Sequence, residues 1–422
     1  MSTAVGDRVA VWATADHSPS TRHFRTFDGL RAIAATMIVL HHAGFTSGES
    51  FRSGWGPYLS RLDIGVPIFF VLSGFLIYRP FVARQFVDRP HPSLRDFYRR
   101  RVLRIFPAYW VAFLVQLVFG AIVVAGVIGF IFNFFLIQIY VPRPRISLSG
   151  ITQAWSLATE LGFYLLLPAW VALSARWVKD RTINSRGLIL LAGCGALMVF
   201  SLLFRATMYA MSPSAAGGWG SVSRYWIFSM ADIFAVGMGL AVISVWSEHR
   251  SIIRDIAARL GRSVWPWWLA AAALFAFVST QLDLANGLTT ASFPRETARQ
   301  FLYAMVGLCI VAPCAFRDDG DGPIRRFLAT RVMTFLGAIS YGIYLWHQAF
   351  IHWIPEWFDW PPSPIVAPDS PAGLFNGHFW QLAIGSFVLA VVVSSLSYYV
   401  VELPLMRRFR RDGLRLRRRS MT

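Results

Sequence analysis

Residues 27–44 read FDGLRAIAATMIVLHHAG, an apolar run that carries four ionisable side chains, Asp28, Arg31, His41 and His42. Eleven positions separate Arg31 from His42. At 100° and 1.5 Å per helical residue, this spacing places them on one face, about 16.5 Å apart along the axis. His41 is rotated by about 100° from His42, so only one of the two histidines follows the stripe of Arg31. The run predicts a helix that is apolar overall and polar along one face.

The composition of the whole chain places this helix in a membrane. Of the 422 residues, 55% are hydrophobic and 15% are charged, whereas soluble proteins average about 25% charged residues. Apolar runs recur along the chain, and a run of about 20 residues crosses a hydrocarbon core of about 30 Å. A soluble globule is therefore excluded, and the predicted fold class is an all-α polytopic membrane protein. Ten spans are predicted, at residues 27–46, 63–83, 105–128, 154–178, 187–211, 225–246, 264–281, 298–316, 333–353 and 377–402.

The arginines indicate the orientation of these spans. The chain has a net charge of +18 and 40 basic residues, of which Lys179 is the single lysine. They gather in every second connection, which is the bias of cytoplasmic loops. Both termini are therefore predicted to be cytoplasmic. Membrane lipid is an expected partner and nucleic acid is not, because no soluble segment presents basic residues beside stacking aromatics. The arginine-rich segments are 84–104, 176–186, 250–262, 317–331 and 407–419.

The chain is expected to comprise one membrane domain and two polar tails. Residues 1–22 are predicted to be a disordered cytoplasmic tail, residues 23–406 a single ten-helix domain, and residues 407–422 a basic cytoplasmic tail. The apolar stretch at 129–140 is too short to cross and is expected to be re-entrant or interfacial. The three cysteines lie in or beside apolar stretches with no spacing for zinc or a disulfide framework, so no metal site is predicted.

Arg31 and His42 are the first candidate site residues. With the amino terminus inside, Arg31 lies toward the cytoplasm and His42 at or beyond mid-membrane, so the pair links two compartments. Each has two readings. Arg31 either pairs with Asp28 one turn away or contributes to a cytoplasmic binding site. His42 either caps its helix near the interface or acts as a base, a role that suits imidazole near neutral pH.

Polar side chains inside later spans either need partners or contribute to the site. Glu160 begins the fourth span, where it either charges an imidazole or is satisfied by backbone amides. Trp155 and Tyr164 are expected to be interface aromatics and are candidates for substrate contact. Asp232 is expected to pair with an arginine, with substrate contact as the second reading. His347, at the outer end of the ninth span, either shapes an acceptor site or sits at the interface.

Two groups of charged residues lie near the predicted cytoplasmic side. Arg101 and Arg104 stand three residues apart at the start of the third predicted helix and therefore share a face. Paired guanidinium groups suit phosphates, but plain positive-inside anchoring gives the same pattern. Glu402 is expected near the cytoplasmic exit, in a salt bridge with Arg407 or Arg408.

Six segments form a further pattern, because they occur together and in a fixed order. They are FDGLRAIAATMIVLHHAG (27–44), GVPIFFVLSGFLI (65–77), RRRVLRIFPAYW (99–110), WSLATELGFYLLLP (155–168), ISYGIYLWH (339–347) and SYYVVELPLMRRFR (397–410). Each alone is a weak signal, but in register they span nearly the whole chain. Together they resemble the acyltransferase 3 family of integral-membrane O-acyltransferases, whose core is ten transmembrane helices.

This resemblance implies a function and residue roles. Family members take an acyl group, usually acetyl, from cytoplasmic acyl-CoA and deliver it to a hydroxyl of a glycan, lipid or small molecule. The family's Arg/Lys and His motif falls on Arg31 and His42, and its RxxR pair on Arg101 and Arg104. These arginines are then expected to meet the coenzyme A phosphates. His42 is expected to act in transfer, either as a base or by holding the acyl group, with Glu160 stabilising the imidazolium.

The sequence departs from the family pattern at two positions. Leu161 stands where many relatives have a second acid, and Pro67 stands where many have an aspartate. Both departures imply an acceptor pocket unlike that of the commonest relatives. The esterase-like domain of some members is expected to be absent, since a short basic tail follows Glu402. The implied location is the bacterial cytoplasmic membrane, with acyl-CoA as a substrate and no tightly bound cofactor.

A transporter is the alternative function that the same residues allow. In a proton-coupled transporter or flippase of an envelope precursor, Arg31, His42, Glu160 and Asp232 would form a proton path through the bundle. The acceptor also stays open among an envelope glycan, a glycolipid and a small molecule, as does the acyl chain length. A homo-oligomer stays open too, because a lipid-facing surface and a subunit contact look alike in one sequence.

Overall fold

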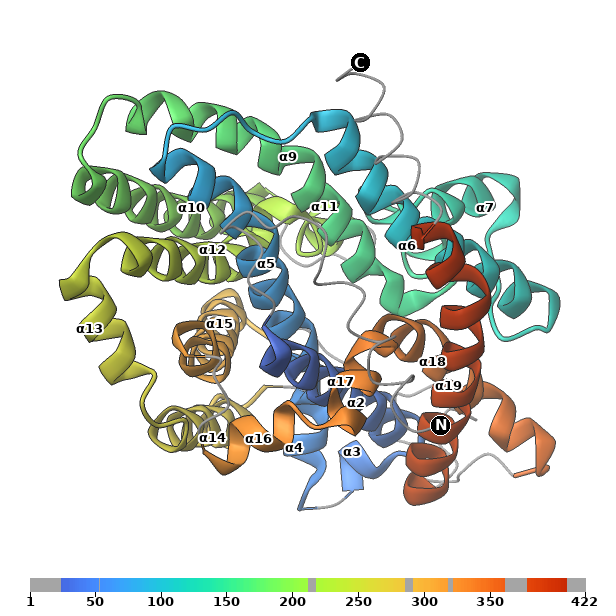
Figure 1. Cartoon of the computed structure of the whole chain (residues 1–422). Helices are drawn as coiled ribbons and strands as arrows, with labels where there is room; N and C mark the ends of the chain where they lie inside the picture. The colour runs from blue at the N-terminus through green and yellow to red at the C-terminus, as the bar shows by residue number, and fades with distance from the viewer. Residues whose placement is uncertain are drawn as a thin grey trace.

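The regular structure of the chain is helical. The computed structural model describes residues 24–52, 54–211, 218–284, 291–317, 322–360 and 378–407. Within these ranges no strand occurs, so the all-α prediction is confirmed (Figure 1). The predicted tail at 1–22 lies outside the described residues, as does that at 407–422 apart from Arg407, and the domain limits at 23 and 406 stay predictions.

A helix occupies each of the ten predicted spans. The ten helices are α2 (Arg25–Thr46), α5 (Gly65–Phe86), α6 (Leu94–Val118), α9 (Trp155–Val178), α10 (Ile183–Met211), α12 (Ile227–His249), α14 (Trp265–Thr280), α15 (Phe293–Phe316), α18 (Ser340–Trp357) and α19 (Phe379–Ser397). Among the described residues, seven helical stretches are long and apolar enough to cross a membrane alone. An eighth is α13 (Ser251–Leu260) joined to α14 with a bend of 61°. The multi-pass membrane fold is confirmed, whereas the count of ten crossings and the side of the termini stay predictions.

The two helices outside that group of eight are α2 and α18. Their polar side chains lower their hydropathy: α2 carries Arg31, His41 and His42, and α18 carries His347. These two helices thus carry Arg31, His42 and His347, as expected if those residues face protein rather than lipid.

Helix α6 is displaced from its predicted span. It begins at Leu94 rather than at residue 105, because its start is set by a cap and not by hydropathy. The Ser93 hydroxyl accepts a hydrogen bond from the Asp96 amide (3.4 Å), which satisfies one of the free amides of the first turn. The prediction that Arg101 and Arg104 begin the helix was therefore wrong, since both lie within it.

The ninth predicted span, residues 333–353, is two helices rather than one. α17 (Arg331–Ala338) ends at Ile339, and α18 follows directly. The break accompanies close packing of α17 on α2, since a Cβ added to Gly337 would lie 2.0 Å from the Asp28 carbonyl oxygen. Helix α18 also packs on α2, with His347 beside His42.

Two segments predicted as connections contain helices. The stretch at 129–140 contains the end of α7 (Gly126–Phe134), which at nine residues is too short to cross, as predicted. The arginine-rich connection at 250–262 contains α13, which meets α14 at the 61° bend.

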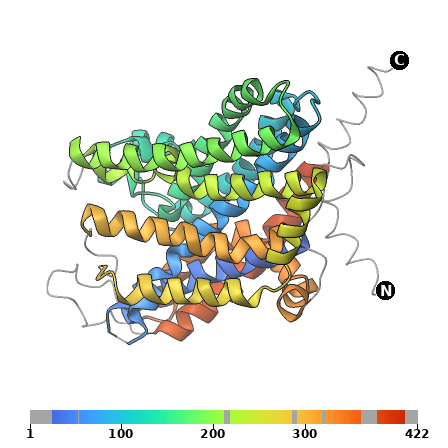
Figure 2. The same ribbon diagram turned by 90° about the vertical axis from the view of Figure 1, so that its left-hand side faces the viewer.

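Helices α5 and α12 form the centre of the bundle. The spans that contain them are 78% and 72% buried, against 28% for those of α10 and α19, which face outward. In Figure 2 the long helices α10, α12, α15 and α14 run side by side. Glycines permit the central contact: a Cβ on Gly237 would lie 2.0 Å from the Val71 carbonyl oxygen, and one on Gly74 would lie 2.3 Å from that of Phe234.

Helix α2 lies within this bundle rather than on its surface. It packs against α5, α17, α18 and α19, and against the short helices α3 (Glu49–Arg52) and α4 (Gly56–Arg61). Phe27, Leu30 and Ile38 on α2 are each about 1% exposed. The polar stripe of α2 therefore has protein around it along its whole length.

We predict that Gly237→Ala destabilises the bundle. The added methyl group overlaps the α5 backbone, and overpacking of this kind costs about 1–3 kcal/mol. The measurement is thermal unfolding of the purified protein in detergent, with a lowered Tm expected. Gly195→Ala is the matched control, since a Cβ at Gly195 meets nothing within 4 Å and the substitution removes only backbone freedom. Equal Tm values for the two variants would contradict the close contact.

Candidate functional site

Five of the nine predicted site residues line one cavity of about 290 Å³, which we call the cationic cavity. They stand on α2, α6 and α9, and α5 and α18 complete the wall. Three guanidinium groups face one carboxylate there, so the lining carries excess positive charge and attracts anions. The five residues are Arg31, Arg101, Arg104, Glu160 and Tyr164.

Glu160 is held by hydroxyl groups of this cavity. Its Oε1 accepts hydrogen bonds from the Tyr164 hydroxyl (2.6 Å) and from the Ser73 hydroxyl. Glu160 was expected either to charge an imidazole or to accept from backbone amides. In these two contacts its partners are side-chain hydroxyl groups instead. Tyr164 is 3% exposed, so the prediction that it is an interface aromatic was wrong: its hydroxyl fixes the carboxylate inside the bundle.

Arg101 has a donor nitrogen that is not paired with any group of the described residues. Its Nε is buried and has no hydrogen-bond partner among the described residues. The guanidinium lies over the ring of Tyr164, with Cζ 5.3 Å from the centroid, which favours the cation at this place. A buried donor without a partner is costly, so an anionic ligand would stabilise this arrangement.

The other arginines of the cationic cavity have acidic neighbours. Arg31 lies 3.9 Å from Asp28, at the limit of an ion pair, and also lines the cationic cavity, while its role in a binding site stays a prediction. Glu402 is 6% exposed and interacts electrostatically with Arg104. This was not expected, since Glu402 was predicted to pair with Arg407 or Arg408, the second of which lies outside the described residues.

A second cavity of about 490 Å³, the histidine cavity, contains His41, His42 and Trp155 in its lining. Both histidines line it although they are rotated by about 100° from each other about the α2 axis. His41 Nδ1 lies 3.1 Å from the Leu59 carbonyl oxygen. Trp155 packs on Tyr225, with ring centroids 4.9 Å apart, and both rings line the cavity.

His42 is paired with His347. His347 is fully buried, and its Nε2 lies 3.0 Å from Nδ1 of His42. Of the two readings of His347, the one that places it at the interface was therefore wrong, and a role in an acceptor site stays a prediction. Helix α18 packs along α2, and this packing joins two side chains that are 305 positions apart in the chain.

Hydrogen-bond geometry fixes the tautomer of the neutral pair. His347 Nδ1 lies 3.1 Å from the Ile343 carbonyl oxygen, which can only accept, so this nitrogen carries the proton and Nε2 carries a lone pair. His42 Nδ1 then donates to that lone pair and to the Ile38 carbonyl oxygen at 3.0 Å. Both contacts place the proton of His42 on Nδ1. Its Nε2 is left as the basic nitrogen.

Asp232 is a structural partner of an arginine, as expected. It pairs with Arg205 (2.8 Å) and accepts a hydrogen bond from Gln300 (2.8 Å). Arg205 and Gln300 line the histidine cavity, whereas Asp232 stands behind them and is absent from the described lining. Its role there is to hold the two side chains that face the cavity.

The cationic and histidine cavities adjoin. Val66, Phe70 and Tyr344 line both, and we call these three residues the neck. The Tyr344 hydroxyl is held at the neck by the Gln153 carbonyl oxygen (2.5 Å) and the Ser156 hydroxyl (2.7 Å). The Arg31 stripe of α2 thus begins at one cavity and ends, at His42, at the other.

Sequence reasoning missed two of these residues. Tyr344 stands three residues before His347, so helical spacing could have placed it on the same face. Ser73 carried no comparable signal, because a lone serine in an apolar run is ordinary. The histidines do not form a metal site: among the described residues, no group of three His, Cys, Asp or Glu side chains is arranged to hold a metal ion.

Comparisons with known proteins agree with this architecture. A family model described as an acyltransferase domain matches residues 24–401. The peptidoglycan O-acetyltransferase OatA of Listeria monocytogenes is 24% identical over 418 residues, which cover 92% of this chain and 56% of the relative. Nodulation protein 10 of Rhizobium leguminosarum is 25% identical over 381 residues, covering 82% of this chain and 89% of the relative. No solved structure is significantly similar.

The extent of these matches defines what they establish. The chain spans about half the length of the Listeria relative, so they bear on the membrane domain and not on the rest of that protein. The family match, in contrast, runs through every helix from α2 to α19. It includes all nine predicted site residues. The chain therefore belongs to the acyltransferase 3 family of integral-membrane acyltransferases.

Proposed function

We propose that this protein is an O-acetyltransferase of the bacterial cytoplasmic membrane. It moves an acetyl group from cytoplasmic acetyl-CoA to a hydroxyl of a cell-envelope glycan. The observation that carries the proposal is the neck, where a cavity lined by three arginines adjoins the cavity of the His42 base. Family membership and a relative named peptidoglycan O-acetyltransferase support the choice of acetyl and of a glycan acceptor.

The donor occupies the cationic cavity. Its phosphates meet Arg101, Arg104 and Arg31, since guanidinium groups bind phosphate oxygens strongly. The arginine-rich loop before α6 places this cavity toward the predicted cytoplasmic side, where acyl-CoA is available. The thioester end extends through the neck, past Phe70 and Tyr344, toward His42.

His42 acts as the general base. Its Nε2 takes the proton of the acceptor hydroxyl as the oxygen attacks the thioester carbonyl carbon. The carbon–sulfur bond breaks, and the leaving thiolate of coenzyme A takes that proton from His42. His347 is a positioning residue: it accepts the Nδ1 proton of His42, which orients the imidazole and keeps Nε2 basic.

Glu160 serves the donor side. Its contacts with Tyr164 and Ser73 hold a negative charge among the arginines. This keeps the guanidinium groups from repelling one another when no donor is bound. In the histidine cavity, the Trp155 and Tyr225 rings offer the flat apolar surface that packs against a sugar ring, beside the base.

The proposal predicts acetyl transfer by the purified protein. In nanodiscs, with acetyl-CoA and an N-acetylglucosamine oligomer as acceptor, we expect a product heavier by one acetyl group, detected by mass spectrometry. His42→Ala should reduce the rate by at least about 10²-fold while coenzyme A binding persists. His41→Ala, the matched control in the same cavity, should retain most of the rate.

Two outcomes would contradict the proposal. Full activity of the His42→Ala protein would remove the base from the mechanism. Movement of unmodified oligomer across the membrane of sealed vesicles that contain the protein, without loss of acetyl from the donor, would instead favour the transporter reading.

The hydrogen bond between the histidines makes a separate prediction. His347→Leu removes the acceptor for the His42 Nδ1 proton, so kcat should fall about 10²-fold with little change in the acceptor KM. His347→Gln places an amide oxygen near the position of Nε2 and should recover most of that loss. If Gln and Leu lowered kcat equally while the Tm values stayed at the parent level, His347 would have no orienting role.

A further inference from the structure

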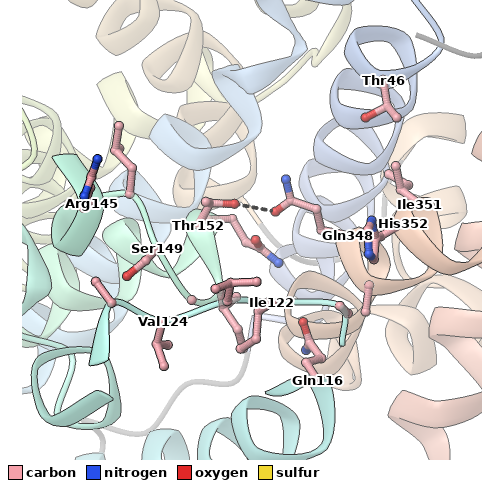
Figure 3. A pocket seen from close by; sticks show the side chains of 18 of the residues that line it. Thr46, Gln116, Ile122, Val124, Arg145, Ser149, Thr152, Gln348, Ile351 and His352 are labelled. Carbon is pink, nitrogen blue, oxygen red and sulfur yellow. Dashed lines mark hydrogen bonds between the residues drawn. The ribbon is translucent and has the colours of Figure 1, made fainter. Parts of the chain in front are cut away.

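A third cavity, of about 650 Å³, lies at the end of the bundle where α2 ends; we call it the amide cavity (Figure 3). Thr46 of α2 and Gln348 and His352 of α18 form one part of its lining. The segment before α9, with Thr152, forms another. Its volume is in the range of small-ligand sites, and neither the donor nor the base occupies it.

The amide cavity continues the histidine cavity. Gln153 lines both. Thr46 stands one helical turn beyond His42 on α2, and Gln348 directly follows His347 on α18. Helices α2 and α18, which position His42 and His347, therefore also supply lining residues of the amide cavity. A ligand that presents one group to His42 can extend into the amide cavity.

The polar part of the lining is made of amides and hydroxyls. The Thr152 hydroxyl donates to Gln348 Oε1 (2.9 Å), and this is the hydrogen bond drawn between the two side chains in Figure 3. Gln116 donates its amide to the Leu345 carbonyl oxygen (3.0 Å). Arg145 is the charged side chain of the lining, and no Asp or Glu is among the described residues that line it.

One polar atom there has no partner. Gln153 is 4% exposed, and its Nε2 donates to the Tyr344 carbonyl oxygen at 3.2 Å. Its Oε1 is buried and accepts no hydrogen bond from the part of the chain that the structure describes. A buried acceptor left unpaired is unfavourable, and this one belongs to the residue that lines both cavities.

Aliphatic side chains complete the lining of the amide cavity. Ile122 and Val124 lie on the segment after α6, and Ile351 of α18 lies next to His352 (Figure 3). A lining that combines amides, hydroxyls and aliphatic side chains matches a carbohydrate, whose hydroxyl and acetamido groups project from a ring with apolar faces. A purely apolar ligand would leave the amides and hydroxyls without a partner.

We propose that the amide cavity binds the acceptor glycan beyond the sugar that receives the acetyl group. The inference rests on the proposed function and deepens it, because it makes the protein an enzyme that acts on a chain and not on a single sugar. The sugar at His42 lies in the histidine cavity, and its neighbour passes Gln153 into the amide cavity.

The test compares acceptor lengths. The probes are N-acetylglucosamine and its β-1,4-linked tetramer, with kcat/KM measured for each. The parent should prefer the tetramer by about tenfold or more, the worth of a few hydrogen bonds. In Gln348→Leu and in the nearly isosteric Thr152→Val, the preference should fall to about twofold. Gln281→Leu, a matched substitution on the exposed surface, should keep the parent preference.

The outcomes separate the two levels of the proposal. No transfer by the parent to either probe, free or lipid-anchored, would overturn the proposed function. Transfer to both with equal kcat/KM, or an unchanged tetramer preference in Thr152→Val, would overturn the amide cavity and leave the proposed function standing. A tetramer on a lipid anchor is assayed in parallel: a preference confined to the anchored form supports the cavity and identifies a lipid-linked source of the glycan.

Discussion

Ionisable side chains inside a membrane bundle must be satisfied by one another, because hydrocarbon offers them no partner. Most of the site follows from this constraint. Helix α2 carries Arg31 and His42 about three turns apart, so both ends of its polar stripe need protein around them. The bundle supplies it by packing α2 against α5, α17, α18 and α19. His347 on α18 meets one end of the stripe, and the arginines of α6 with Glu160 of α9 meet the other.

This arrangement gives the bundle two cavities with different linings. The cationic cavity gathers positive charge and holds its single lining carboxylate with hydroxyl groups, which suits it to an anion. The histidine cavity holds an imidazole whose proton position is fixed by two acceptors. Val66, Phe70 and Tyr344 line both, so the two cavities are neighbours in the bundle.

The sequence was sufficient for the features that depend on one helix at a time. Hydropathy located a helix at each of the ten spans, and helical spacing put Arg31 and His42 on one face. It was insufficient elsewhere, for two reasons. The cap at Ser93 is local, but hydropathy does not register a cap, so the start of α6 was misplaced. The close approach of Gly337 to α2, which accompanies the division of the ninth span, depends on a second segment. The pairing of His42 with His347 could not be read from a single chain, since periodicity carries no information on contacts between distant helices.

The central claim is that the donor extends through the neck from the arginines to His42. The most direct measurement is a cryo-electron microscopy structure with a non-hydrolysable acetyl-CoA analogue in which a methylene replaces the thioester sulfur. The account predicts phosphate density at Arg101 and Arg104, and an acetyl carbonyl beside His42 between Val66 and Tyr344. An analogue bound at another surface, or one whose acetyl end stops in the cationic cavity, would contradict it.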